Sequence, residues 1–136
     1  MKVRYLLDTN ICIYILKQRP AEVVARFESL QVGEVVISLI THGELRFGAE
    51  KSHSSARVHE SLDELLALMP VLPMSDQVAF EYGKIRADLQ QRGCVIGAND
   101  LWIAAQALAE DLILVSNNIR EFERVTALKL ENWVTC

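Results

Sequence analysis

The stretch VRYLLDTNICIYIL, residues 3–16, places a single carboxylate, Asp8, between two apolar segments. The run before it, residues 3–7, is short and mostly apolar, which is typical of a strand covered on both faces. The segment after it has a helical pattern that ends before Pro20. Taken alone, Asp8 is explained as well by a helix cap or an Asx-turn as by a functional role.

The composition suits one domain, residues 1–136, because 51% of the 136 residues are hydrophobic. No apolar run approaches the ~20 residues that a membrane helix needs. Asp8 falls where a signal peptide would be apolar, so we expect no signal peptide. The three cysteines form no C-x-x-C pair, which argues against disulfides or a zinc site and fits the cytoplasm. A net charge of −4 does not indicate a strongly basic nucleic-acid binder, although local basic patches remain compatible with it.

Short apolar runs that alternate with helical segments predict the fold class. The strand candidates are residues 3–7, 35–40, 71–74 and 112–116, with a weaker run, residues 128–134, expected at a sheet edge. The helical candidates are residues 10–18, 21–31, 41–51, 56–69, 75–93 and 99–111. This alternation predicts an α/β fold in which a parallel sheet of four or five strands is flanked by helices.

Two further acids have local explanations of their own. Glu44 ends the segment THGE, residues 41–44, which matches the S/T-x-x-E capping box with Thr41 as the cap. Asp100 opens an apolar helix, where the helix dipole favours an acid. A carboxylate taken into such an apolar environment nevertheless needs a partner or a cation.

The joint placement of these acids is harder to explain locally. Asp8 follows the first strand, Glu44 follows the second by a few residues, and residues 116–118 follow the fourth. Ligands of an open parallel sheet bind outside the carboxyl ends of its strands, and helix packing can bring Asp100 alongside. Converging carboxylates repel one another, and a hard cation such as Mg²⁺ or Mn²⁺ offsets that repulsion. We therefore expect Asp8 to be a metal ligand.

The sequence resembles a PIN domain, and specifically the VapC toxins of bacterial type II toxin–antitoxin modules. Four blocks carry the likeness: LLDTNICIY (residues 6–14), ISLITHGELRFGA (37–49), IGANDLWIAAQALAEDLILVSNNIREFERV (96–125) and LENWV (130–134). The blocks follow the family's order and spacing and span nearly the whole chain. The resemblance implies a Rossmann-like, three-layer PIN fold and a metal-dependent endoribonuclease.

By this resemblance, the catalytic positions are Asp8, Glu44, Asp100 and Asn118, and the three acids would bind Mg²⁺, with Mn²⁺ as the alternative. Many PIN domains have Asp where this chain has Asn118. One metal ion is therefore well supported, and a second would need the RNA phosphate as a ligand. The implied substrate is a structured RNA, in the first place tRNA with initiator tRNA as a candidate, and its cleavage would inhibit translation and growth.

Six further residues are predicted to contact the substrate. Thr9, Asn10, Ser38 and Ser116 fall on positions near the site that are commonly polar in the family, and Arg46 and Arg120 are basic residues close to the motifs. RNA binding beside an acidic site needs such positive charge. The resemblance also implies a VapB-like antitoxin as partner and a homodimer that can join a larger toxin–antitoxin assembly. We expect no membrane partner.

Two other classes of α/β protein with clustered acids fit the sequence less well. A response-regulator receiver needs paired acids after the first strand, whereas Asp8 stands alone, and a haloacid-type phosphatase needs D-x-D where this chain has Asn10. Two alternatives within the fold stay open. One is a catalytically weak interaction subunit, which the neutral Asn118 would suit, and the other is a metal-dependent DNase.

Overall fold

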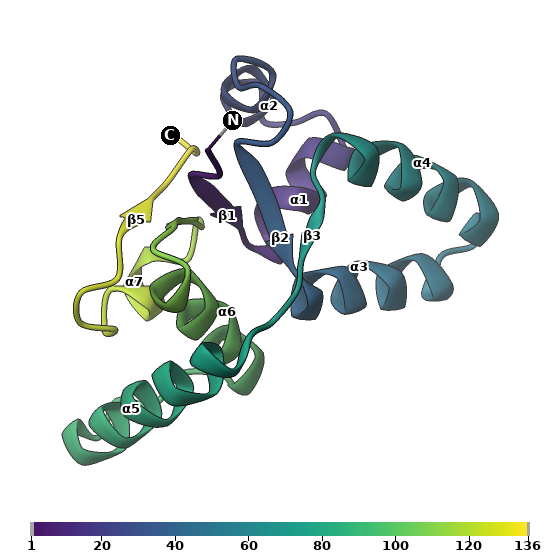
Figure 1. The fold of residues 1–136 in the computed structure, drawn as a ribbon. Coiled ribbons are helices and arrows are strands. Elements are labelled where there is room, and N and C mark those ends of the chain that lie inside the picture. The colour runs from purple at the N-terminus through teal and green to yellow at the C-terminus, as the bar shows by residue number, and fades with distance from the viewer. Residues whose placement is uncertain (1, 136) are drawn as a thin grey trace.

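The computed structural model describes residues 2–135, and a five-stranded parallel sheet runs through its centre (Figure 1). The strands are β1 (Tyr5–Leu7), β2 (Val35–Ser38), β3 (Val71–Leu72), β4 (Ile113–Val115) and β5 (Leu130–Glu131). Their spatial order is β3-β2-β1-β4-β5, so β1 is the central strand. The predicted parallel α/β sheet is confirmed, including the edge position of its last strand.

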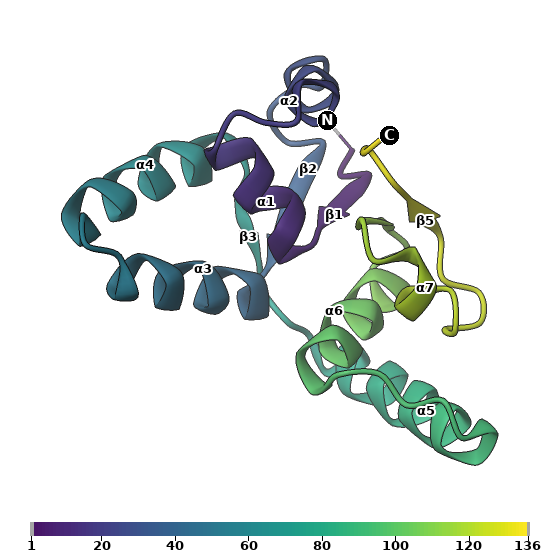
Figure 2. The ribbon, with the colours of Figure 1, turned by 180° about the vertical axis from the view of Figure 1, so that it is seen from behind.

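Helices cover both faces of this sheet. They are α1 (Thr9–Leu16), α2 (Ala21–Glu28), α3 (Leu39–Lys51), α4 (Ser55–Leu68), α5 (Asp76–Arg92), α6 (Ala98–Ala109) and α7 (Ile119–Phe122). Figures 1 and 2 show that α3 and α4 form a hairpin that projects from one side of the molecule, while α5 projects from the other side beside α6. No helix within residues 2–135 is long and apolar enough to cross a membrane.

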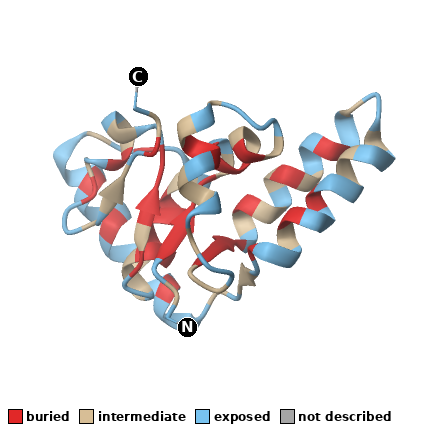
Figure 3. Cartoon of the chain, turned by 90° about the horizontal axis from the view of Figure 1, so that it is seen from above, coloured by how far each residue is buried: buried red, intermediate tan, exposed pale blue. Residues whose placement is uncertain are grey.

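The two faces of the sheet bury different side chains, because neighbouring residues of a strand point to opposite faces. Leu6 and Leu114 pack into a cluster with residues of α5, α6 and α7. Tyr5 and Leu7 pack into a second cluster with residues of α1 to α4. Figure 3 shows the buried residues gathered on the strands and on the inward helix faces. Burial on both faces explains why the strands read as continuous apolar runs.

The start of α3 differs from the prediction. The helix begins at Leu39, and Ser38 caps it, because the Ser38 Oγ accepts a hydrogen bond from the Ile40 backbone N–H at 3.1 Å. Thr41 and Glu44 both lie inside the helix. The capping-box interpretation of residues 41–44 is therefore wrong, and the Glu44 carboxylate is not used at a helix start.

Two smaller differences concern elements at the edges. Within residues 2–135, β3 pairs only with β2, and it is half-buried, not fully buried as expected. The short helix α7 was not predicted, since its four residues are too few for a helical pattern to show.

The predicted end of α5 is confirmed: Gly93 adopts a φ of 70°, the left-handed conformation that glycine tolerates.

Candidate active site

Asp8 is fixed where β1 meets α1. Its backbone N–H donates to the carbonyl of Val115 on β4 at 3.0 Å. Its Oδ1 accepts a hydrogen bond from the backbone N–H of Ile11 at 3.0 Å, which caps α1. The residue is only 5% exposed. The cap and a functional role are compatible, because capping uses one carboxylate oxygen and fixes the direction of the whole group.

The second carboxylate oxygen of Asp8 is held by Ser116. The Ser116 Oγ donates to Asp8 Oδ2 at 2.6 Å and accepts a hydrogen bond from the backbone N–H of Asn118 at 2.9 Å. Ser116 and Ser38 are both 0% exposed, so neither hydroxyl can reach a substrate directly. Instead of the direct contact predicted for them, Ser116 orients Asp8 from beneath the site and Ser38 caps α3.

Glu44 points from α3 toward α1 and α6. Its Oε1 accepts a short hydrogen bond from Thr9 Oγ1, and its Oε2 accepts one from Asn99 Nδ2 at 3.3 Å. The Thr9 hydroxyl also lies 3.3 Å from Thr41 Oγ1. Thr9 therefore links α1 to α3 and orients the Glu44 carboxylate.

Asp100, in the first turn of α6, lies beside a carboxylate that sequence reasoning missed, that of Glu121. Burial, followed by the charge and the hydrogen bond of Glu121, raises the pKa of Asp100 to about 7, and the other two acids add to this. Glu121 Oε1 accepts a hydrogen bond from the Gly97 backbone N–H at 2.9 Å, and Oε2 accepts one from Asn118 Nδ2. Below about pH 7 the Asp100 carboxyl group therefore retains its proton.

The sequence did contain a signal for Glu121. It follows Asn118 by three residues, which is the spacing of side chains that meet on one face of a helical turn. The structure confirms that the two side chains bond to each other. Glu121 therefore supplies, next to Asn118, the negative charge that the neutral amide lacks.

The predicted catalytic residues line one hollow of about 230 Å³ at the carboxyl edge of the sheet. Its lining consists of Asp8, Thr9, Asn10, Glu44, Asp100, Asn118 and Phe122. Thr9 and Asn10 are thus the two predicted substrate contacts that share this hollow with the acids. Burial, and to a lesser extent the charge of Glu44, raises the pKa of Asp8 even though Ser116 and Ile11 donate hydrogen bonds to it. The hollow is accordingly a region of uncompensated negative charge.

The donors of this hollow fit a hydrated hard cation. Its polar side chains offer oxygen and amide groups and no thiol or imidazole. Within residues 2–135, no three acidic, histidine or cysteine side chains are grouped closely enough to enclose a metal ion by themselves. Mg²⁺ usually keeps several waters and is held by one or two carboxylates together with substrate phosphates. The spread arrangement therefore suits such an ion better than a metal bound only by protein ligands.

The two basic residues predicted to contact RNA lie outside the hollow. Arg46 donates hydrogen bonds to His42 Nε2 at 3.0 Å, to His59 Nδ1 at 2.9 Å and to Asp63 Oδ1 at 2.6 Å. These contacts tie α3 to α4 and occupy the guanidinium. Arg120 is exposed on α7, and its guanidinium has no ion-pair or hydrogen-bond partner in the described part of the chain.

Comparison with known proteins identifies the family of this chain. A sequence model of the PIN domain matches residues 5–128. The chain is 47% identical over 132 residues to the ribonuclease VapC2 of Haemophilus influenzae, a match that covers 97% of this chain and 99% of that protein. The chain belongs to the PIN-domain family of VapC ribonucleases.

Other VapC proteins are similar over the same length. The tRNA(fMet)-specific endonuclease VapC of Shigella flexneri is 41% identical and aligns with 96% of this chain and 98% of its own length. The crystal structure of VapBC2 from Rickettsia felis, bound to a DNA fragment from its promoter, superimposes with a TM-score of 0.90 at 39% identity and covers 98% of this chain and 100% of that one. The PIN-like fold expected from the sequence is confirmed. PIN-domain VapC nucleases generally depend on a divalent metal ion.

Proposed function

We propose that the protein is the toxin of a type II toxin–antitoxin module, a Mg²⁺-dependent endoribonuclease that cleaves tRNA in the cytoplasm. One observation carries the proposal: Asp8, Glu44 and Asp100 line a single hollow in a chain of the VapC family. The similarity to a tRNA(fMet)-specific endonuclease makes initiator tRNA the first substrate to test. Cleavage of that tRNA would stop translation and growth.

The side chains of the hollow have separate tasks. Asp8, Glu44 and Asp100 would together hold the hydrated cation, Mg²⁺ or, in its place, Mn²⁺. When bound, the cation would neutralise charge on the scissile phosphate and favour ionisation of a water. The Asn118 amide donates from its Nδ2 to Glu121, and its Oδ1 would be available as a further oxygen ligand. The proton on Asp100 would leave when the cation enters.

The experiment uses purified toxin, free of antitoxin, with total tRNA in Mg²⁺, in Mn²⁺ or in chelator, and the cut ends are sequenced. We expect cleavage only with metal, and products with a 5′-phosphate and a 3′-hydroxyl. Asp8→Asn keeps an acceptor for the Ile11 N–H, so it should fold and melt normally yet lose at least about 100-fold in rate. Intact tRNA under every metal condition, or full activity of Asp8→Asn, would overturn the proposal.

The two alternatives have less support. A catalytically weak interaction subunit would have no use for three carboxylates in one hollow, where their mutual repulsion costs stability. A DNase would use the same acids, and no described residue distinguishes the two sugars. A DNA oligonucleotide with the sequence of a tRNA loop, incubated in parallel, tests whether DNA is also cut.

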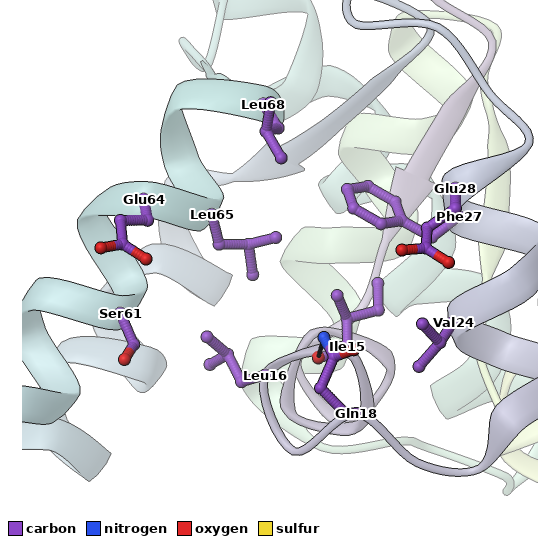
Figure 4. Close-up of a pocket in the computed structure, with 10 residues that line it drawn as sticks. All are labelled: Ile15, Leu16, Gln18, Val24, Phe27, Glu28, Ser61, Glu64, Leu65 and Leu68. Carbon is purple, nitrogen blue, oxygen red and sulfur yellow. Dashed lines mark hydrogen bonds between the residues drawn. The ribbon is translucent and has the colours of Figure 1, made fainter.

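The expected protein partner is a VapB-like antitoxin, and a hollow between α1, α2 and α4 suits its docking. Figure 4 shows apolar side chains such as Ile15, Phe27 and Leu65 facing one another, with Glu28 and Glu64 beside them. An amphipathic helix with basic flanks fits an apolar groove with acids at its rim. The chain aligns over nearly its whole length with the toxin of solved VapBC complexes, which supports this partner.

A charge reversal tests this docking surface. Glu28→Lys together with Glu64→Lys should weaken inhibition by the antitoxin, while the free toxin should still cleave tRNA. Sedimentation of the free toxin at several concentrations tests the expected homodimer. Equal inhibition of wild type and of the double variant would mean that the antitoxin docks elsewhere.

A further inference from the structure

We infer that Lys17 and Arg57 bind RNA phosphates that flank the cleaved position, in a second hollow between α1, α3 and α4. The inference rests on the proposed ribonuclease function. This hollow has a volume of about 450 Å³, and Lys17 and Arg57 both line it. Most of the remaining lining is small or apolar, for example Leu45 and Val58.

The second hollow adjoins the candidate active site. Glu44 lines both of them, so this residue lies at the border between the acidic hollow and the hollow that contains Lys17 and Arg57. An RNA strand whose scissile phosphate lies beside Asp8 can therefore continue past Glu44 into the second hollow. There the next phosphates would meet Lys17 and Arg57.

The charges of Lys17 and Arg57 are free to bind such a ligand. Both side chains are exposed, and neither has an ion-pair or side-chain hydrogen-bond partner among the residues that the structure describes. Arg46, on the same helix pair, differs because Asp63 and two histidines already occupy it. Of the described residues around the second hollow, Glu44 is the only acid, and it already accepts hydrogen bonds from two neighbours.

The hollow in Figure 4 provides an internal contrast. It shares Leu16 and Ser61 with the second hollow, but its described lining contains Glu28 and Glu64 and no basic side chain. A polyanion is repelled from that side and attracted to the other. The charges therefore direct an RNA strand along α3 and α4 and leave the acidic groove to a basic partner.

Such cations are needed on physical grounds. The active-site hollow carries several acids and repels a phosphate backbone until a metal ion is present. Lys and Arg beside the site offset this repulsion and release counterions from the RNA, so binding becomes dependent on salt. Each phosphate contact that is removed should weaken binding and reduce the salt slope by about one.

The test measures kcat and KM for tRNA cleavage at several salt concentrations. For Lys17→Ala combined with Arg57→Ala we expect a KM about 10-fold higher, a kcat within about 2-fold of wild type and a salt slope smaller by about 1 to 2. Lys17→Arg and Arg57→Lys should keep most of the affinity. Lys84→Ala, an exposed change on α5, is the matched control and should behave as wild type.

A second measurement separates this inference from the proposed function. Fluorescence anisotropy of a labelled single-stranded oligoribonucleotide, in chelator, reports binding without cleavage. Loss of RNA binding in the double variant supports the inference whether or not the wild type cleaves tRNA. If the wild type leaves tRNA intact, only the proposed function is overturned. Unchanged binding, KM and salt slope would overturn the inference. Unchanged RNA binding with lost antitoxin affinity would overturn it too, because the hollow would then be a protein-docking surface.

Discussion

Ser116 donates a hydrogen bond from its Oγ to Asp8 Oδ2 across 2.6 Å, and it thereby joins the ends of β4 and β1, which are 108 residues apart in the sequence. The Ser116 Oγ also accepts a hydrogen bond from the backbone N–H of Asn118 at 2.9 Å. A fully buried serine therefore orients a carboxylate of the candidate site and positions the loop that follows β4. Groups that orient a ligand in this way affect metal affinity and activity without touching the substrate.

Removal of this hydroxyl should affect both stability and activity. Ser116→Ala leaves the Asn118 N–H without its partner and deprives Asp8 of a donor, so we expect a loss of about 1 to 3 kcal/mol in the free energy of unfolding. Activity should fall about 10- to 100-fold. Urea unfolding and tRNA cleavage measure the two effects. Ser29→Ala is the control, because among the described residues the Ser29 Oγ bonds only to an exposed carbonyl. Wild-type activity in Ser116→Ala would contradict the positioning role.

The raised pKa of Asp100 predicts that the metal-free protein loses stability as the pH rises. The folded carboxyl group titrates at about 7, whereas an unfolded Asp titrates near pH ~3.9. Between these values the folded state binds more protons, so the stabilisation is complete below the lower value and is lost as the pH rises through the upper one. Melting temperatures in chelator, from pH 5 to pH 8, should therefore fall more steeply for wild type than for Asp100→Asn.

The comparison with Asp100→Asn is necessary because another group acts in the opposite direction. Burial lowers the pKa of His42, and this alone makes stability rise with pH. The histidine is present in both proteins, so the difference between their curves isolates Asp100. Added Mg²⁺ should stabilise wild type most above pH 7, where the carboxylate is ionised. Parallel melting curves for the two proteins would show that Asp100 does not titrate as expected.

Glu121 should set the pH at which the enzyme becomes active. Its charge and its hydrogen bond contribute to the high pKa of Asp100. Glu121→Gln removes that charge, so the acid limb of the kcat/KM profile should shift to lower pH, and activity at pH 6 relative to pH 8 should rise several-fold. Glu123→Gln, an exposed change at the end of the same helix, is the matched control. An unchanged profile in Glu121→Gln would mean that this pair does not control cation entry.

Arg46 should behave as a structural residue, in contrast to its predicted role in RNA binding. Arg46→Ala breaks the contacts from α3 to Asp63 and His59 on α4, and we expect a melting temperature lower by a few degrees with an unchanged KM for tRNA. Arg46→Lys should also lower the melting temperature, because a single ammonium cannot replace a guanidinium that bonds to three groups at once. A raised KM with a normal melting temperature would instead support the prediction that Arg46 contacts RNA.

Much of the sheet and the meeting of the acids could be predicted from the sequence. The strands are buried on both faces, so they appear as apolar runs, and the acids follow the ends of these runs. β1 lies between β2 and β4, and parallel neighbours end at the same edge of a sheet. Asp8, Glu44 and the loop with Asn118 therefore converge by topology alone.

The partners of individual side chains could not be predicted in this way. Whether Ser38 caps a helix or faces RNA depends on where β2 ends, and the capping-box match at residues 41–44 competes with it in the sequence. The ion pair between Arg46 and Asp63 depends on the packing of α3 against α4. Spacing along one helix reveals neighbours such as Asn118 and Glu121, but contacts between helices need coordinates.

The central place of β1 bears on how this chain folds. Asp8, after β1, and Ser116, after β4, are 108 residues apart in the sequence, so their hydrogen bond forms only once these two distant strands have paired. The acidic hollow therefore depends on long-range closure of the sheet, and a partly folded chain with β4 unpaired carries the acids without the arrangement that brings them together.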